Sequence, residues 1–111
     1  MLSSKRYPQW RSRRPPRDIW QQNRKRIWNR DQQRCQGPYC QDKPKGSLLL
    51  KQAHIDHIIE LSLGGTNADS NLRALCRRCH TLRISHAHRG MIRAALNRGE
   101  IPSDWRSLLW K

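Results

Sequence analysis

Apolar residues recur with helical spacing in two stretches of the chain. Between positions 18 and 30 they lie at i, i+1, i+8 and i+9, which places them on one face of a helix that packs against the core. Asp18 is expected to cap this helix, because two prolines stand just ahead of its first turn. A second helix is expected over residues 88–98, with Gly99 ending it and Pro102 following. The apolar positions are Ile19, Trp20, Ile27 and Trp28 in the first helix, and Met91, Ile92, Ala95 and Leu96 in the second.

Extended structure is expected in the middle of the chain. Residues 47–59 contain β-branched residues and Leu with a partial alternation, and residues 71–75 form a second short apolar run. A loop with Gly64-Gly65 separates the two, and a further helix is expected to begin at Arg77. Residues 105–110 are expected to close the chain as a short amphipathic turn that packs on the core. Strands followed by helices predict a small α+β fold.

The composition indicates a thin hydrophobic core. The chain has 111 residues, which is one domain, with no Phe and 35% hydrophobic residues. A chain this small often needs a covalent or metal staple. Residues 1–17 are polar, basic and rich in proline, so we expect a flexible basic arm there. Residues 18–111 are expected to form the single domain.

The charge balance points to a polyanionic partner. Lys and Arg number 23 against 8 Asp and Glu, which gives a net charge of +15, and nucleic acid is the partner most often matched to such a surface. No segment is apolar and long enough to span a bilayer, and the start of the chain lacks the apolar stretch of a signal peptide. We therefore expect a cytoplasmic protein. In a reducing compartment, four cysteines in two close pairs indicate a metal site rather than disulfides.

The cysteines have the spacing of a closed zinc site. Cys35 and Cys40 flank a Gly-Pro turn, and Cys76 and Cys79 form a Cys-x-x-Cys pair. Two close pairs from separate turns are the usual source of four tetrahedral sulfur ligands. Zinc bound there would join the two pairs, and its binding energy would add to the folding energy.

Residues 53–84 contain a denser motif, AHIDHIIELSLGGTNADSNLRALCRRCHTLRI. An Asp-His pair, a Gly-Gly loop, Asn-Leu and Cys-x-x-Cys-His follow one another in this order. This stretch resembles the signature of the HNH nucleases, named after a His, an Asn and a His. Here these are His57, Asn71 and His80.

The resemblance implies a ββα-metal fold, in which two strands and a helix hold a divalent ion. It implies that Asp56 and His80 are ligands of that ion, which would be Mg²⁺ or Mn²⁺, with Ni²⁺ or Zn²⁺ as alternatives. It also implies that His57 is the general base and that Asn71 steadies the loop carrying the base. By strand alternation, His54 shares the face of Asp56, which opens a supporting role for it. His86 and His88 match nothing in the motif.

Two features of this motif need an explanation before the residue roles can be carried over from the family. A regular strand sends Asp56 and His57 to opposite faces, so both can serve one site only where the strand ends or bulges. Family members often carry a Lys shortly after the last His, and here Arg83 stands in that region as a candidate phosphate clamp. The residues expected to contact nucleic acid are Arg24, Lys25, Arg77, Arg78 and Arg83.

These observations predict a metal-dependent endonuclease that hydrolyses phosphodiester bonds in DNA, held mainly through the phosphate backbone. Two alternatives remain open. The first is a non-catalytic zinc module that binds nucleic acid. The second is a nuclease subunit that is active only in a larger assembly, such as a phage packaging or restriction system, in a bacterial or phage-infected cell.

Overall fold

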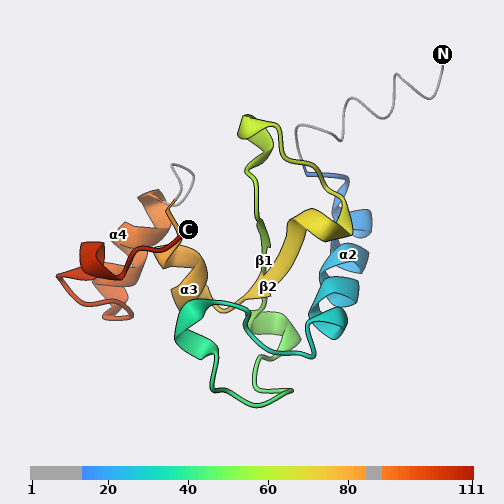
Figure 1. Cartoon of the computed structure of the whole chain (residues 1–111). Helices are drawn as coiled ribbons and strands as arrows, with labels where there is room; N and C mark the ends of the chain where they lie inside the picture. The colour runs from blue at the N-terminus through green and yellow to red at the C-terminus, as the bar shows by residue number, and fades with distance from the viewer. Residues whose placement is uncertain (1–13, 85–88) are drawn as a thin grey trace.

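The computed structural model describes residues 14–84 and 89–111 (Figure 1). Within these residues, two strands and three α-helices follow one another as α2 (Arg17–Arg30), β1 (His54–His57), β2 (Leu72–Leu75), α3 (Arg77–Leu82) and α4 (Arg89–Arg98). The predicted α+β fold class is thereby confirmed. Residues 1–13 of the expected arm, together with His86 and His88, lie outside the described residues, so the predictions made for them remain predictions.

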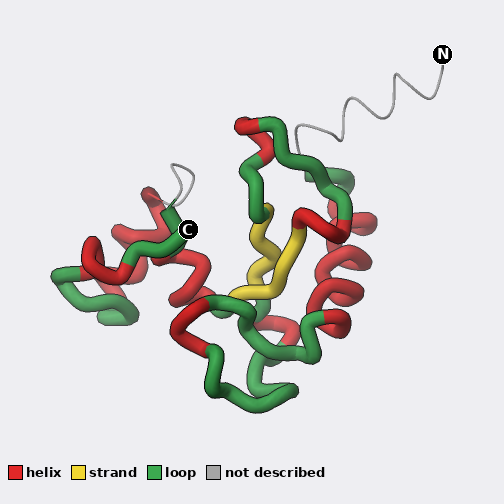
Figure 2. The backbone as a smooth tube through the Cα atoms, in the orientation of Figure 1, coloured by secondary structure: helices red, strands yellow, loops and turns green. Residues whose placement is uncertain are grey.

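The two strands form an antiparallel hairpin at the centre of the fold. Its register places His54 opposite Leu75 and Asp56 opposite Arg73. Residues that face each other across a hairpin project from the same face of the sheet, so His54 and Asp56 share one face while Ile55 and His57 share the other. Figures 1 and 2 show the hairpin between α2 on one side and α3 on the other, with α4 beyond α3.

Helix α2 packs its aromatic and aliphatic side chains on the hairpin as predicted. Trp20 and Ile27 are buried, and the indole N–H of Trp28 donates to the carbonyl of Leu48 at 2.7 Å. The prediction that Asp18 caps the helix is wrong, because Pro16 occupies the N-cap position and no side chain caps it. Asp18 lies within the first turn instead, where a carboxylate still interacts favourably with the helix dipole.

The segment before β1 is less extended than its sequence predicts. Of residues 47–59, only His54–His57 form a strand, and Leu50–Gln52 form a short 3₁₀ turn. The reason lies in the tertiary structure, since the guanidinium of Arg24 donates to the carbonyls of both Leu50 and Ala53. These hydrogen bonds stabilise the turn over the strand that the alternation favours.

The loop between the strands needs a glycine for a steric reason. A Cβ on Gly65 would lie 1.8 Å from the carbonyl oxygen of Ile59, a distance that no other residue tolerates. The N–H of Gly65 donates to the carbonyl of Glu60 at 2.9 Å. The loop therefore closes on itself directly after β1 and holds its backbone near the end of that strand.

A second, smaller core lies beyond α3. Leu82 of α3 packs with Ala95 of α4 and with Ile101, while Trp105 and Trp110 cover this cluster. The predicted C-terminal turn is a 3₁₀ helix, Trp105–Leu108. The chain end then runs beside the end of α3, where the N–H of Ile84 donates to the carbonyl of Trp110 at 2.7 Å.

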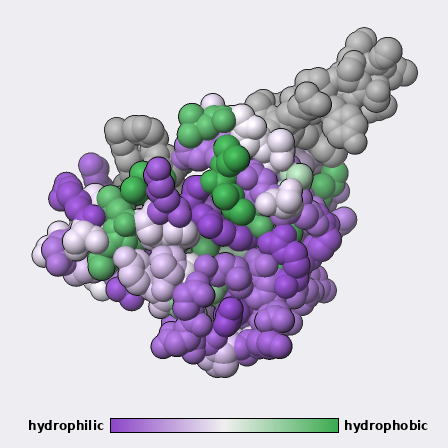
Figure 3. All heavy atoms as spheres, in the orientation of Figure 1, coloured by the Kyte–Doolittle hydropathy of each residue, from purple (hydrophilic) through white to green (hydrophobic). Residues whose placement is uncertain are grey.

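The face of the molecule drawn in Figure 3 is mostly hydrophilic. Hydrophobic side chains gather over the loop that follows β1, where Ile58, Ile59 and Leu63 are exposed. These residues line a groove together with Arg73 of β2, Arg83 at the end of α3 and Trp105 of the C-terminal turn.

Candidate metal centre and HNH site

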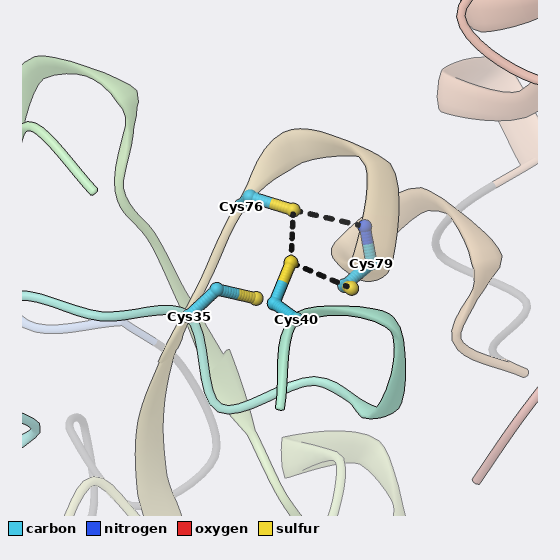
Figure 4. Close-up of side chains that lie close together, drawn as sticks. All are labelled: Cys35, Cys40, Cys76 and Cys79. Carbon is cyan, nitrogen blue, oxygen red and sulfur yellow. Dashed lines mark hydrogen bonds between the residues drawn. The ribbon is translucent and has the colours of Figure 1, made fainter. Parts of the chain in front are cut away.

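The four cysteine sulfurs converge on one point (Figure 4). All lie within 4.8 Å of one another, and the Sγ of Cys40 lies 3.8 Å from that of Cys76 and 3.9 Å from that of Cys79. Four sulfurs at the zinc–sulfur bond length of 2.3 Å stand about 3.8 Å apart in a tetrahedron. The predicted four-cysteine site is confirmed as a cluster positioned to hold one metal ion, consistent with a zinc-stapled core.

Local backbone structure directs each pair of sulfurs inward. Cys40 ends a 3₁₀ turn, Pro38–Cys40, and Cys76 is the N-cap residue of α3. Backbone N–H groups point at two of the sulfurs, since Gly37 donates to the Sγ of Cys35 at 3.3 Å and Cys79 donates to the Sγ of Cys76 at 3.4 Å. Such donors favour the thiolate form, which is the form that binds zinc.

Gly37 is required beside this cluster. A Cβ at this position would lie 2.6 Å from both the Cβ and the Sγ of Cys79, and 3.4 Å from the Sγ of Cys35. The turn between Cys35 and Cys40 can therefore approach α3 only because residue 37 has no side chain.

The thiols share their protons unevenly. Hydrogen bonding from Cys35, and then from Cys79, lowers the pKa of Cys76. Hydrogen bonding to Cys76 raises the pKa of Cys35 to about 11, and the hydrogen bonds to Cys35 and Cys76 raise the pKa of Cys79. A bound cation removes this competition, because it stabilises all four thiolates together.

A second group of polar side chains surrounds Asp56, on the face of the hairpin that meets α3. Asp56 is 2% exposed, and its Oδ2 lies 2.9 Å from the Nε of Arg73 and 3.2 Å from the Nε of Arg83. Its other oxygen, Oδ1, lies 3.6 Å from the Nε2 of His80. The carboxylate is thus held by two guanidinium groups on one side and faces an imidazole on the other.

The gap between Asp56 and His80 fits one divalent ion. Ligand distances of 2.0–2.2 Å at a tetrahedral angle place two donor atoms about 3.4 Å apart, and an octahedral ion brings them slightly closer. The observed 3.6 Å between Oδ1 and Nε2 needs only a small closure to reach either value. An oxygen and an imidazole nitrogen also suit the ions expected from the sequence.

His57 lies on the opposite face of the hairpin, toward α2. Its ring stacks on that of Trp20, with the ring centroids 5.5 Å apart and the planes 7° from parallel. Its Nε2 lies 2.9 Å from the Oδ1 of Asn67, in the loop after β1. An amide oxygen only accepts hydrogen bonds, so His57 donates from Nε2 and its Nδ1 holds the lone pair.

Asn71 secures the loop between the strands. Its Oδ1 accepts from the N–H of Ile59 at 2.9 Å, and its Nδ2 donates to the carbonyls of Ile59 and Thr66 at 3.0 and 2.7 Å. The side chain therefore joins the two ends of the loop that carries Asn67. It has no contact with Asp56 among these bonds.

The basic residues expected to contact nucleic acid fall into two groups. Arg24 is half-buried and donates to backbone carbonyls, and Arg83 is 8% exposed, paired with Asp56 and bonded to the carbonyl of Ile58. Lys25, Arg77 and Arg78 are exposed. Arg77 also pairs with Glu100 at 3.2 Å, and Arg78 lies over the ring of Tyr39.

Two residues of the site were not singled out from the sequence. Asn67 is a loop residue ten positions after His57, and nothing in the motif's order indicates its hydrogen bond. Arg73 had a readable signal, because it follows Asn71 by two residues in the second strand and the antiparallel register brings it opposite Asp56. Its Nη2 is buried and has no hydrogen-bond partner among the described residues.

Comparison with known proteins finds a family model that matches the middle of the chain. Residues 35–85 match the family model described as HNH endonuclease, and this range covers both cysteine pairs, Asp56, His57, Asn71 and His80. Searches of curated proteins and of solved structures returned no match. No helix within residues 14–84 and 89–111 has the length and apolar character to cross a membrane.

Proposed function

We propose, from the match of residues 35–85 to the HNH endonuclease family model, that this protein is a metal-dependent endonuclease hydrolysing phosphodiester bonds in DNA. The observation that carries the proposal is the position of Asp56 Oδ1, which lies 3.6 Å from Nε2 of His80. The next residue after Asp56 is His57, whose Nε2 is hydrogen-bonded to Asn67. A fold that needed only zinc and positive charge would have no use for an imidazole facing this carboxylate.

Asp56 and His80 would hold the catalytic ion, with Mg²⁺ or Mn²⁺ first and Ni²⁺ or Zn²⁺ as alternatives. When bound, the ion supplies electrostatic stabilisation of the charge that develops on the phosphate and on the leaving 3′ oxygen. The residues of the chain itself orient the two ligands. Arg73 and Arg83 hold Oδ2 of Asp56 and so direct Oδ1 toward His80.

His57 would take the proton from the attacking water. An imidazole nitrogen that holds a lone pair can do this, and the hydrogen bond to Asn67 keeps that lone pair on Nδ1. Trp20 supports the ring by stacking, which limits its rotation. Asn71 acts at one remove, because it holds the loop that presents Asn67.

The placement of His57 and Asp56 on different faces suits an in-line reaction. The attacking and leaving oxygens stand on opposite sides of the phosphorus, so the base and the ion act from opposite directions. β1 ends at His57, and a phosphate at this strand end would have the base on the α2 side and the ion on the α3 side.

Positive side chains would bind the DNA backbone. Lys25, Arg77 and Arg78 are exposed, and the overall charge of +15 favours binding through phosphates. We assign the clamp on the reacting phosphate to Arg73 rather than Arg83, since the side chain of Arg73 is 19% exposed and that of Arg83 only 9%. Such contacts position the duplex without reading its sequence.

One observation favours a non-catalytic zinc module as the alternative. Arg73 and Arg83 already balance the charge of the Asp56 carboxylate, as they would in a purely structural ion pair. A third candidate is a nuclease subunit that acts only with partner proteins, as in phage packaging or restriction systems of the bacterial cytoplasm.

A plasmid-nicking assay separates these three functions. The purified chain is incubated with supercoiled DNA and with Mg²⁺, Mn²⁺ or Ni²⁺ in turn, and Asp56→Asn serves as the matched control. The nuclease proposal expects nicked or linear DNA from the parent and none from the variant. A chain that binds DNA with every metal yet never cleaves it, alone or with added cell extract, is a binding module. Cleavage only with extract identifies the subunit.

A further inference from the structure

A pair of imidazoles lies next to the Asp56 carboxylate, and its role extends beyond the residues of the motif. His54, the first residue of β1, places its Nδ1 3.0 Å from the Nδ1 of His80 on α3. The rings meet edge to face, with centroids 5.1 Å apart and planes at 72°. This geometry is that of one hydrogen bond, so one of the two nitrogens donates its proton and the other accepts it.

The other nitrogen of His80 decides which way this bond runs. Nε2 of His80 faces Oδ1 of Asp56, and an imidazole binds a cation only through a nitrogen that holds a lone pair. A neutral His80 that binds through Nε2 carries its proton on Nδ1. That proton then points at His54, whose Nδ1 must be the acceptor.

We propose that His54 is a positioning residue for the catalytic ion, which fixes His80 in the Nδ1–H tautomer and turns its Nε2 toward Asp56. This inference rests on the proposed function, because it takes Asp56 and His80 as the ligands. Ligating histidines generally donate their second N–H to an acceptor that orients the ring and raises its basicity. Here a second histidine fills the place usually held by a carboxylate or carbonyl.

The strand provides the means for this arrangement. His54 and Asp56 lie two residues apart on β1, so their side chains leave the hairpin on the same face. One strand thus contacts both nitrogens of the same ring, with His54 at Nδ1 and Asp56 near Nε2. His80 itself comes from α3, whose first turn is held in place by the cysteine cluster. The turn that carries Cys76 and Cys79 and the strand therefore set the geometry of the ion site together.

The test measures metal affinity without DNA or cleavage. Binding of Mn²⁺ to the zinc-loaded protein is followed by electron paramagnetic resonance, for the parent, His54→Ala and His54→Asn. The Oδ1 of Asn stands close to the place of the His Nδ1 and accepts a hydrogen bond. We expect His54→Ala to weaken Mn²⁺ binding by about 10–100-fold, and His54→Asn to restore most of this loss. Zinc content and the thermal midpoint of each variant show that the fold is intact.

Nitrogen-15 NMR of the Mg²⁺-bound protein gives a second readout. The expected signature for His80 is a protonated Nδ1 and an unprotonated Nε2. The inference is overturned if His54→Ala binds Mn²⁺ as the parent does, if His54→Asn is as weak as His54→Ala, or if His80 carries its proton on Nε2. Asp56→Asn distinguishes a wrong ligand assignment from a wrong role for His54. If it too leaves Mn²⁺ affinity unchanged, the ligand assignment of the proposed function fails, whereas a loss in Asp56→Asn alone leaves that function standing and rejects only the role of His54.

Discussion

The side chains of Asp56 and His57 leave β1 on opposite sides of the hairpin, although the residues are neighbours. The Asp56 carboxylate lies 3.6 Å from His80 of α3, and the His57 ring stacks on Trp20 of α2. No bulge brings them to one face, since both residues keep regular partners on β2. The strand end is therefore the place where the proposed base and the proposed ion can both reach one phosphate.

His57→Ala should lower DNA cleavage by about 10²-fold or more, as expected for the loss of a general base. DNA binding and zinc content should stay at the parent's level. Cleavage is measured as initial rates of plasmid nicking at saturating Mg²⁺. His57→Phe is the matched variant, because it retains the stacking on Trp20 but has no basic nitrogen. A parent-like rate in either variant removes His57 from the role of base.

Asn71→Ala should destabilise the fold by about 2 kcal/mol, since three hydrogen bonds that close the loop are lost and three backbone groups need new partners. Urea unfolding followed by tryptophan fluorescence measures this change. Asn71→Asp keeps the acceptor for Ile59 N–H but sets a carboxylate oxygen against the carbonyl oxygens of Ile59 and Thr66, so its loss should be at least as large. Equal stability of all three proteins would show that the side chain does not hold the loop.

Arg78→Ala should reduce the slope of log affinity against log salt by about 1, because one phosphate contact releases one counterion fewer. The affinity is measured by fluorescence anisotropy on a short duplex between low and moderate salt. Arg26→Ala is the control, since the Arg26 guanidinium pairs with Asp69 at 2.8 Å and is expected to contribute little to binding. A slope that changes equally in both variants would mean that general charge, not the position of Arg78, determines binding.

Gly37→Ala should disrupt the cysteine cluster, because the added methyl group would lie 2.6 Å from the Sγ and Cβ of Cys79. Bound zinc, measured by a colorimetric chelator after gel filtration, should fall, and the thermal midpoint should fall with it. Gly90→Ala provides the control, since a Cβ there meets nothing within 4 Å. Alanine also has the higher helix propensity by about 1 kcal/mol, so that variant should be at least as stable as the parent.

The main helices and the four-cysteine cluster could be predicted from the sequence because their signals are local. The Cys-x-x-Cys pair and the Gly-Pro turn each constrain a few neighbouring residues, and the spacing of Trp20 and Ile27 reports one helix face. The turn at Leu50–Gln52 had no such signal, because its hydrogen bonds come from Arg24, which stands 26 and 29 residues away from the carbonyls it binds.

The local sequence pattern also could not predict the roles of individual arginines. Arg24 and Arg83 belong to basic stretches that look solvated in sequence, yet the fold uses them to hold carbonyls and the Asp56 carboxylate. Charge density indicates a polyanionic partner but does not say which guanidiniums remain available to it. The contact between His54 and His80 depends on how α3 packs against β1, and the pattern of residues along the sequence does not reveal that packing.

Mild chelation with two readouts tests the central claim most directly, namely that a closed four-cysteine site supports the fold while an open Asp56–His80 site supports cleavage. Brief treatment with EDTA should stop plasmid nicking while the far-UV circular dichroism spectrum and the thermal midpoint stay near those of the untreated protein, because the thiolate site releases zinc far less readily than the open site releases its ion. Addition of Mg²⁺ or Mn²⁺ should then restore nicking, whereas Cys76→Ser should lose its fold and gain nothing from added Mg²⁺. If brief chelation unfolds the parent and abolishes nicking in step, one metal serves both purposes and the separate catalytic ion at Asp56 and His80 is contradicted.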